Sequence, residues 1–463
     1  MPDLRIYDSL SRTLVDFKPR DEGKVSIYAC GLTPQAPAHL GHMRGAVLFD
    51  VVRNWLNYLG YEVDFVQNFT DIDDKIIRRS AEEGMPASEI AAKYGDRYLR
   101  DLALLNVKPA RWVYVTRNMD AIIEMISKII EHGHAYEVDG DVYFRVLSDK
   151  DYGKLSHRKL SEMREGSRIE VDPRKEHPMD FALWKSAKPD EPSWDSPWGE
   201  GRPGWHIECS ALSLQELGPN FDIHAGGVDL IFPHHENEIA QAEAYLEAAE
   251  FAKIWMHWGS VQLAQKKMSK SEGNVLPVRE AIERYSAGAV RLFLLNSSYR
   301  GPIDYVEGRM AESQSSFSRI ETSLSRIRQK LGQPEGAEYD EVLLRQFSAA
   351  MNSDFNTAAA VATLHDAVGS LNELMAEGIG EDRSCAESIF KTALLFAEIL
   401  GLPVQGMENG DHLLDDLMTK VIQWREELRK QKLFDMADTM RADVANVGIL
   451  LEDSVEGTTW RRK

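Results

Sequence analysis

The sequence predicts a parallel α/β domain with an insertion, followed by an all-α helix bundle and a small C-terminal domain. Three observations lead to this fold class. Strand-like and helix-like segments alternate over roughly the first hundred residues, as in parallel sheets covered by helices. The alternation stops near residue 116 and resumes near 205, which indicates an insertion. Beyond about residue 310 apolar residues recur at helical spacing, without convincing strands.

The first α/β unit is compact. KVSIYAC (24–30) predicts a buried strand, residues 39–60 predict a helix, and YEVDFVQNF (61–69) predicts the next strand. The helix follows from apolar residues that recur every four positions, at Val47, Val51, Trp55 and Leu59. Ligands of such sheets bind at the carboxyl ends of the strands.

The remaining elements follow in order. Within the insertion, 116–204, we expect a helix near 118–132, a hairpin over 134–146 and a loop rich in Pro, Gly and Trp. The sheet resumes with a helix at 205–217, a strand at 221–227 and a helix that opens at Pro233, a favourable first-turn residue. The predicted domains are 1–115 with 205–250, the insertion 116–204, a connecting region 251–309, the bundle 310–400 and the C-terminal domain 411–463, with a linker at 401–411.

Composition limits the function classes. The chain has 463 residues and a formal net charge of −20, which argues against coating nucleic acid through bulk positive charge but leaves room for a local basic patch. No leader-like start or membrane-length apolar run occurs, so we expect a cytosolic protein. Three cysteines are too few for a disulfide framework and suit a reducing compartment.

Four residues form a candidate metal site. His234 and Glu238 lie at i and i+4, on one face of a predicted helix, whereas His235 would pair with Ile239, which binds no metal. Cys30 at the end of a strand and Cys209 early in a helix could complete a zinc site if those elements are adjacent. The alternative is that the cysteines never meet the His/Glu pair. The third cysteine, Cys385, is expected in the core of the bundle.

A first candidate phosphate site is His39-Leu40-Gly41-His42, where the loop after the first strand turns into a helix. Backbone N–H groups and the dipole of a helix N-terminus favour anions. The alternative is that one histidine caps the helix and the other is solvated.

A second candidate is Lys267-Met268-Ser269-Lys270-Ser271, which places two ammonium groups and hydroxyl donors on a glycine-flanked loop. Such a loop can close over a polyphosphate and neutralise charge that develops during transfer. The alternative is an ordinary solvated basic turn.

The two phosphate motifs, in this order around an interrupted α/β fold, resemble those of the class I aminoacyl-tRNA synthetases, and the whole chain resembles the cysteinyl-tRNA synthetases. The resemblance runs from end to end. The matching stretches are YACGLT (28–33), GYEVDFV (60–66), NFTDIDDKIIRR (68–79), PMDFALWK (178–185), GRPGWHIECSA (201–211), FDIHAGGVDLIFPHHENEIAQ (221–241), KMSKSEGN (267–274) and LLEDSVEGTTWRRK (450–463).

The resemblance implies a Rossmann-like catalytic domain and a reaction in which L-cysteine and ATP give cysteinyl-adenylate, after which the cysteinyl group passes to the 3′ end of tRNA(Cys). It implies one zinc ion on Cys30, Cys209, His234 and Glu238, which selects the substrate thiol over the hydroxyl of serine. Mg²⁺ accompanies ATP, and a monomer is expected. The implied catalytic and ATP-binding residues are His39, Gly41, His42, Lys267, Ser269 and Lys270.

Further residues receive roles from the same resemblance. Trp205, His206 and His224 are expected to wall the amino-acid pocket; the alternative is that they pack around the metal. Asp71, Asp73 and Asp74 would hold a cation or the tRNA acceptor end, or form a solvated loop. Residues 411–463 would bind the anticodon through a stacking surface on Trp460 and charged groups on Arg429, Asp438, Asp453, Arg461 and Arg462. The alternative for Arg429, Asp438 and Asp453 is that they are ordinary helix-surface charges.

Departures from the family pattern leave alternatives. Residues 33–36 read Thr-Pro-Gln-Ala where the family has T-V-Y-D, so no role is carried onto positions 34–36. A mycothiol-type ligase that joins cysteine to an amino sugar shares the catalytic half, and Thr33-Pro34 leans slightly its way, but the full-length helical half and the GTTWRRK tail lean against it. A paralogue that only binds tRNA is the third hypothesis; intact signature motifs and metal ligands argue against it.

Overall fold

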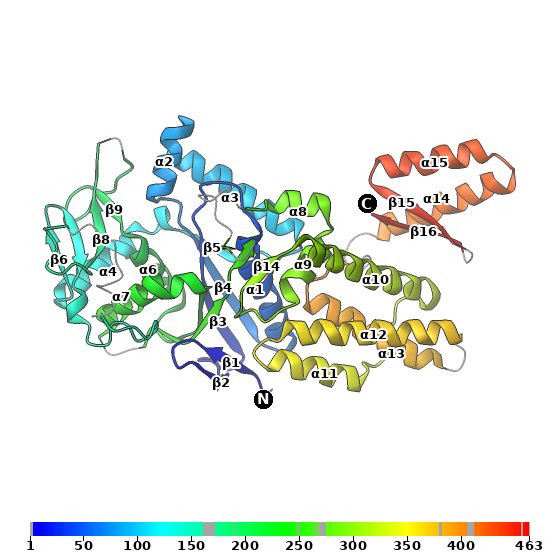
Figure 1. Cartoon of the computed structure of the whole chain (residues 1–463), viewed down its shortest axis with the longest axis horizontal. Coiled ribbons are helices and arrows are strands. Elements are labelled where there is room, and N and C mark those ends of the chain that lie inside the picture. The colour runs from blue at the N-terminus through cyan, green and yellow to red at the C-terminus, as the bar shows by residue number, and fades with distance from the viewer. Residues whose placement is uncertain are drawn as a thin grey trace. The chain divides into compact units, whose positions relative to one another are not determined.

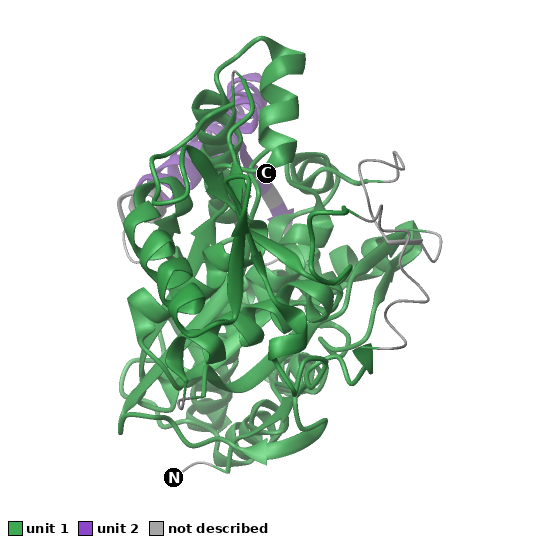
Figure 2. Ribbon diagram, turned by 90° about the vertical axis from the view of Figure 1, so that its left-hand side faces the viewer, with its two compact units in different colours: residues 1–402 green, residues 403–463 purple. Residues whose placement is uncertain are grey.

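The computed structural model describes residues 3–160, 172–189, 191–247, 250–263, 266–267, 275–378, 382–404, 412–454 and 457–462. The chain divides into two compact units, Met1–Leu402 and Pro403–Lys463 (Figure 2). The division falls inside the predicted linker at 401–411. Within the described ranges, no helix has the length and apolar character that a membrane span requires.

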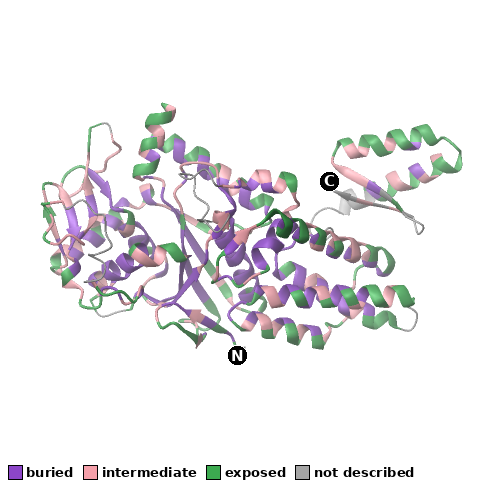
Figure 3. Ribbon diagram, viewed as in Figure 1, coloured by how far each residue is buried: buried purple, intermediate pink, exposed green. Residues whose placement is uncertain are grey.

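A five-stranded parallel sheet forms the centre of the first unit (Figure 1). Its strands in spatial order are β11 (Ala252–Trp258), β10 (Phe221–Gly227), β3 (Lys24–Leu32), β4 (Glu62–Phe69) and β5 (Arg111–Tyr114). The inner strands β3 and β10 are buried over most of their length (Figure 3), as is usual for parallel strands that helices cover on both faces. Because β11 extends the sheet, the α/β fold continues past the expected limit at residue 250.

Helices connect and cover these strands. The expected helix at 39–60 is α1 (Leu40–Tyr58), and the expected helices at 118–132 and 205–217 are α4 (Met119–Glu131) and α6 (Trp205–Leu217). Three more helices complete the layers: α2 (Asp74–Glu83), α3 (Ala87–Leu104) and α7 (Glu236–Leu246).

The helix expected to open at Pro233 begins with an irregular turn. Pro233 follows a cis peptide bond within a π-helical turn, Ile231–His235, and the regular α-helix α7 begins at Glu236. Phe232 has extended backbone angles, so helical backbone starts at Pro233 and leads through His235 into α7.

The insertion carries its own antiparallel sheet, with strands β6 (Ala135–Val138), β7 (Asp141–Phe144), β8 (Phe181–Ser186) and β9 (Gly201–Pro203) in that spatial order. The predicted hairpin at 134–146 is the β6–β7 pair. A smaller sheet orders β13 (Lys266–Lys267), β12 (Val261–Leu263) and β14 (Ile303–Tyr305).

An N-terminal hairpin that the sequence did not predict packs on the main sheet. It pairs β1 (Arg5–Asp8) with β2 (Thr13–Asp16). The Ser9 N–H donates to the Trp255 carbonyl at 2.9 Å, and the Trp255 N–H donates to Asp8 Oδ1 at 2.9 Å, so the turn is fastened to β11.

The helical half of the first unit follows the predicted periodicity. Its helices are α8 (Val278–Arg284), α9 (Ala287–Leu295), α10 (Glu307–Leu331), α11 (Glu341–Asn352), α12 (Thr357–Glu377) and α13 (Arg383–Ile399). Cys385 was expected in the bundle core, but it is exposed on the first turn of α13. The buried face of that helix is instead occupied by Ala386, Ile389, Phe390 and further apolar residues.

The second unit contains α14 (His412–Lys430), α15 (Phe434–Asn446) and the strands β15 (Ile449–Ser454) and β16 (Gly457–Arg462). The strands form an antiparallel hairpin, which corrects the expectation of no convincing strands in this half. The hairpin carries Leu451, which is buried, opposite Trp460.

Candidate active site

The structure brings Cys30, Cys209, His234 and Glu238 together. One potential ligand atom from each residue lies within 4.8 Å of those of the other three, and all four residues are buried. His234 Nε2 lies 3.0 Å from Glu238 Oε1, and Cys30 Sγ lies 3.4 Å from the same oxygen. The four residues come from β3, α6, the π-helical turn and α7, so the alternative in which they never meet is wrong.

The donor set fits a zinc ion. Two sulfurs, one imidazole nitrogen and one carboxylate oxygen suit tetrahedral zinc. Burial and the nearby Cys209 thiol raise the pKa of Cys30, while burial lowers the pKa of His234 to about 3. Without a cation the thiol is therefore held protonated and the imidazole neutral; a bound divalent ion reverses the preference of the thiol.

Two further histidines hold the ligands. His206 Nδ1 lies 2.9 Å from His234 Nδ1, and His224 Nε2 lies 2.7 Å from Glu238 Oε2. Such contacts orient metal ligands and tune their basicity. His224 is fully buried against Glu238, so of the two alternatives for this residue the structure shows packing around the cluster and not the wall of an open pocket.

Trp205 stacks on His234, with ring centroids 4.3 Å apart. Trp205 and His206 border a hollow of about 320 Å³ that also meets Lys185 and Asp74. This hollow shares Thr33 and Lys75 with the main cavity described below, so the two are neighbours.

The HLGH motif forms the start of α1. His39 is the N-cap, and its Nδ1 accepts the Gly41 N–H at 3.1 Å, while His42 Nδ1 accepts the His39 N–H at 3.2 Å. The two rings lie 3.9 Å apart and both line the main cavity. His39 therefore caps the helix and lines the cavity at the same time. The two alternatives that the sequence left open for this motif do not exclude each other.

One cavity of about 830 Å³ reaches from Cys30 of the metal cluster to this helix N-terminus. It is called the main cavity for these residues and not for its size, because a second cavity has about 980 Å³. The lining of the main cavity includes Cys30, His39, Gly41, His42 and Asp229. It lies at the carboxyl ends of β3 and β10, where ligands of parallel sheets bind. Its volume is in the range of sites for small molecules and cofactors.

Gly31 is needed at this edge of the sheet. Its N–H donates to Asn68 Oδ1 at 2.8 Å, and a Cβ atom on residue 31 would lie 1.7 Å from the Asn68 carbonyl oxygen. Only glycine permits this approach of β3 to β4.

Several cavity residues escaped the sequence analysis, notably Asp229, Trp258 and Lys75. Asp229 lies in the short helical turn Val228–Leu230 that follows the carboxyl end of β10, and Trp258 ends β11. A position at the carboxyl end of a strand was therefore the feature of the sequence that could have marked these residues as cavity residues. For Trp258 this feature could not be used, because β11 was not predicted as a strand of the main sheet. In the divergent segment, Thr33, Gln35 and Ala36 line this cavity, whereas Pro34 lines a second one.

The KMSKS motif is described only at its first residue. The backbone of Lys267 in β13 pairs with Gln262 in β12, and Val261 of β12 lines the main cavity. The motif therefore begins next to the cavity wall. Ser269 and Lys270, with Met268 and Ser271, lie outside the described residues.

The three carboxylates of TDIDDK have separate partners. Asp71 accepts the N–H and the hydroxyl of Thr116, and Asp73 accepts the Lys75 N–H as the N-cap of α2. Asp74 pairs with Lys185 and Arg202 of the insertion sheet. The residues that the structure describes place no common cation site on these three carboxylates. Asp74 is half-exposed, and a role in holding the tRNA acceptor end stays a prediction.

In the second unit, Asp453 accepts two hydrogen bonds from Arg425, at 2.7 and 2.9 Å, and one from Thr458. Arg425 is buried, so this pair fastens α14 to the hairpin. Arg429 lies 3.4 Å from the same carboxylate and is exposed, as is Asp438 on α15. Trp460 is half-buried; for Arg461 and Arg462 only the β16 backbone is described.

The comparisons with known proteins agree with this geometry. Residues 16–315 match the family described as tRNA synthetases class I (C) catalytic domain, and residues 346–405 match the DALR domain. The chain is thus a member of the class I aminoacyl-tRNA synthetases, with a helical C-terminal region that includes a DALR domain.

The particular family follows from curated relatives. Proteins named Cysteine--tRNA ligase from Dehalococcoides mccartyi and Carboxydothermus hydrogenoformans are 44% and 45% identical, over 99% of this chain and 100% of each relative. The chain belongs to the family of cysteine–tRNA ligases.

Solved structures share the fold. A methionyl-tRNA synthetase of Mycobacterium tuberculosis in complex with methionyl-adenylate is 16% identical, with a TM-score of 0.56 over 81% of this chain and 89% of its own. An Agrobacterium radiobacter LeuRS in a ternary complex with tRNA and LeuAMS is 11% identical, with a TM-score of 0.62 over 83% of this chain and 85% of its own.

Proposed function

We propose that the chain activates L-cysteine with ATP and transfers the cysteinyl group to the 3′ end of tRNA(Cys). One observation carries this proposal: Cys30 of the metal cluster and the HLGH start of α1 line the same cavity. A thiol-binding group at one end and an anion-binding helix N-terminus at the other suit an amino acid joined to a nucleotide.

In the first step, a carboxylate oxygen of cysteine attacks the α-phosphorus of ATP. The new O–P bond replaces the bond to the β-phosphate oxygen, which leaves as pyrophosphate. The backbone N–H groups of α1, with His39 and His42, receive the phosphates, and Lys267 and Lys270 neutralise the departing pyrophosphate. No protein nucleophile is required, because positioning and electrostatic stabilisation carry the step. Mg²⁺ enters with ATP.

Cys30, Cys209, His234 and Glu238 would hold one zinc ion. Zinc binds a thiolate far more strongly than a serine hydroxyl, which is harder and much less acidic. His206 and His224 keep the imidazole and carboxylate ligands in place, and Trp205 covers His234. An apolar pocket alone separates such analogues by only about 1–3 kcal/mol, so the donor set would replace proofreading.

The second unit would bind the anticodon. Trp460 offers a ring on which a base stacks, and Arg429, Asp438, Arg461 and Arg462 supply charged groups. Asp453 serves this surface through its bond to Arg425, which holds the hairpin. We further propose that the protein acts as a cytoplasmic monomer, and sedimentation of the purified chain would test its oligomeric state.

The test combines metal analysis, pyrophosphate exchange and tRNA charging. The proposal predicts bound zinc, exchange that depends on cysteine and not on serine, and cysteinyl-tRNA formation with a tRNA(Cys) transcript. Turnover with an amino sugar and no cysteinyl-tRNA would instead establish the mycothiol-type ligase. An inactive protein that still binds tRNA would establish the non-catalytic paralogue. The DALR match and the full-length relatives favour the tRNA ligase over both.

A further inference from the structure

A chain of hydrogen bonds leads from the metal cluster to the N-terminal hairpin. Cys30 Sγ lies 3.3 Å from His235 Nε2, His235 Nδ1 lies 2.8 Å from His257 Nε2, and His257 Nδ1 lies 2.8 Å from Ser9 Oγ. All four residues are buried. They come from β3, the π-helical turn, β11 and the turn between β1 and β2, so four separate segments meet along one line.

The direction of these bonds follows from the sulfur. A metal-bound thiolate can only accept, so His235 donates from Nε2. A neutral imidazole has one N–H, so His235 Nδ1 accepts from His257 Nε2 and His257 Nδ1 accepts from the Ser9 hydroxyl. With both imidazoles neutral, every contact is then satisfied: the thiolate sets the tautomer of both rings, and the Ser9 hydroxyl donates to the last ring nitrogen.

The surrounding structure holds this chain in place. Two hydrogen bonds join the hairpin to the Trp255 backbone, one from the Ser9 N–H and one to the Asp8 carboxylate, and they place the Ser9 hydroxyl beside His257. Gly226 leaves room for the His235 ring, because a Cβ on residue 226 would lie 2.5 Å from His235 Cε1.

We propose that Ser9, His257 and His235 are positioning residues that hold the Cys30 sulfur as a thiolate ligand and thereby raise the metal affinity of the site. This inference rests on the proposed zinc site. It gives a role to the N-terminal hairpin, most of which precedes the matched region at 16–315. It also gives a role to His235, which the i, i+4 spacing did not favour as a metal ligand.

The test measures zinc affinity of the full chain by competition with a chromophoric chelator, together with the sulfur-to-cobalt absorption band of the Co²⁺-substituted protein. His257→Ala should weaken zinc binding about 10–100-fold and shift the cobalt band. Ser9→Ala should act in the same direction, and Ser9→Thr, which keeps the hydroxyl, should restore the parent values.

Ser11→Ala is the matched control, because Ser11 is exposed in the same turn and its hydroxyl pairs with Thr13 at 3.0 Å. It should change neither readout. The unfolding temperature of each metal-free variant separates a structural loss from a metal-specific one, and if His257→Ala fails to fold, the Ser9 pair decides.

Unchanged zinc affinity and an unchanged cobalt band in Ser9→Ala and His257→Ala would overturn the inference. A second result would also overturn it: His235→Ala loses the metal while Ser9→Ala and His257→Ala keep the parent affinity. His235 would then be a direct ligand, since the potential ligand atoms of Cys30, His224 and His235 also lie within 4.8 Å of one another. Absence of zinc from the parent protein would be a different result, because it refutes the proposed metal site itself.

Discussion

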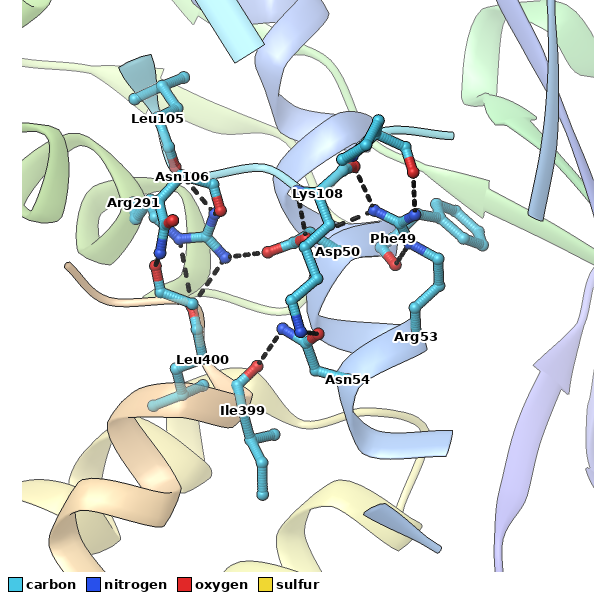
Figure 4. A network of polar contacts seen from close by, with 12 residues as sticks. Phe49, Asp50, Arg53, Asn54, Leu105, Asn106, Lys108, Arg291, Ile399 and Leu400 are labelled. Carbon is cyan, nitrogen blue, oxygen red and sulfur yellow. Dashed lines mark hydrogen bonds and ion pairs between the residues drawn. The ribbon is translucent and has the colours of Figure 1, made fainter. Parts of the chain in front are cut away.

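Arg291 of α9 donates from Nη2 to Oδ2 of Asp50 in α1 at 2.7 Å, and both side chains are almost completely buried (Figure 4). The other guanidinium N–H groups reach the carbonyls of Leu105, Asn106 and Leu400. Asp50 Oδ1 in turn accepts the Lys108 N–H at 2.9 Å. This network ties the helix that begins with HLGH to the end of α13 in the bundle.

Replacing Arg291 with Met should therefore be severely destabilising. Removing one partner of a buried ion pair typically costs about 3–5 kcal/mol in the free energy of unfolding. Asp50 keeps its longer ion pair with Arg53, at 3.4 Å, so we expect a loss near the lower end of that range. Urea denaturation measures the loss. Arg284→Met is the control, because Arg284 pairs with Glu280 on an exposed face, and it should cost less than about 1 kcal/mol. Equal losses in the two variants would contradict this prediction.

His39→Asn separates capping from catalysis. Asparagine is among the best N-cap residues, so the unfolding temperature should remain near that of the parent. Pyrophosphate exchange should fall about 100–1,000-fold, since a group that stabilises charge in the transition state is lost. Full exchange activity in a folded His39→Asn protein would remove His39 from the ATP site.

Cys209→Ser should lose the metal and raise the apparent KM for cysteine. The serine hydroxyl is a poor ligand for zinc compared with a thiolate. Metal content by elemental analysis and cysteine-dependent exchange provide the two readouts, and exhaustive chelation of the parent should reproduce the effect. Cys385→Ser is the matched control, because Cys385 is exposed on α13, and it should keep its metal.

Asp74 should contribute stability in a pH-dependent way. Burial opposes its ionisation, but hydrogen bonds and charge from Lys185 and Arg202 outweigh this and lower its pKa to about 2. The unfolded value is about 3.9, so the contribution is complete above roughly pH 4 and is lost as pH falls towards 2.

Asp74→Asn should accordingly cost a measurable amount at pH 7, and the difference from the parent should shrink below pH 4. The side chain is half-exposed, so we expect at most about 1 kcal/mol. Denaturant titrations of both proteins at several pH values measure the difference. A difference that is constant from pH 7 to pH 2.5 would show that the charge plays no part.

Trp460→Ala tests the second unit. If a base of the anticodon stacks on this ring, its loss should weaken tRNA binding by about 1–3 kcal/mol. The KM for tRNA in charging assays should rise, while cysteine-dependent pyrophosphate exchange, which needs no tRNA, should be unchanged. An unaltered KM for tRNA would place the contact elsewhere.

Local patterns were the strongest guide to the fold and the site. The run 24–30, the four-residue spacing in 39–60 and the run 61–69 correspond to β3, α1 and β4. The i, i+4 spacing of His234 and Glu238 selected two residues whose side chains do converge, although one stands in a π-helical turn rather than in the helix. Cys385 shows the limit: it lies on the predicted helix, but it is exposed on the first turn, before the buried face begins at Ala386.

Long-range contacts could not be predicted in this way. The position of β11 depends on its pairing with β10. The N-terminal hairpin and the tail hairpin depend on turns that carry no clear sequence signal. Asp71, Asp73 and Asp74 make the point within four residues of chain, because each carboxylate turns to a different partner: Thr116, the start of α2, and the insertion sheet.

The sequence by itself determined which chemical groups this protein has and which local elements carry them: strands and helices from hydrophobic period, a helix N-terminus at HLGH, and a ligand pair from helical spacing. Only the tertiary structure decided that Cys30 and Cys209 reach that pair, that Ser9 lies behind His257, and that Arg291 meets Asp50. Periodicity arises from interactions within a few residues, whereas these contacts join segments up to 248 residues apart, and only the packing of the whole sheet brings them together.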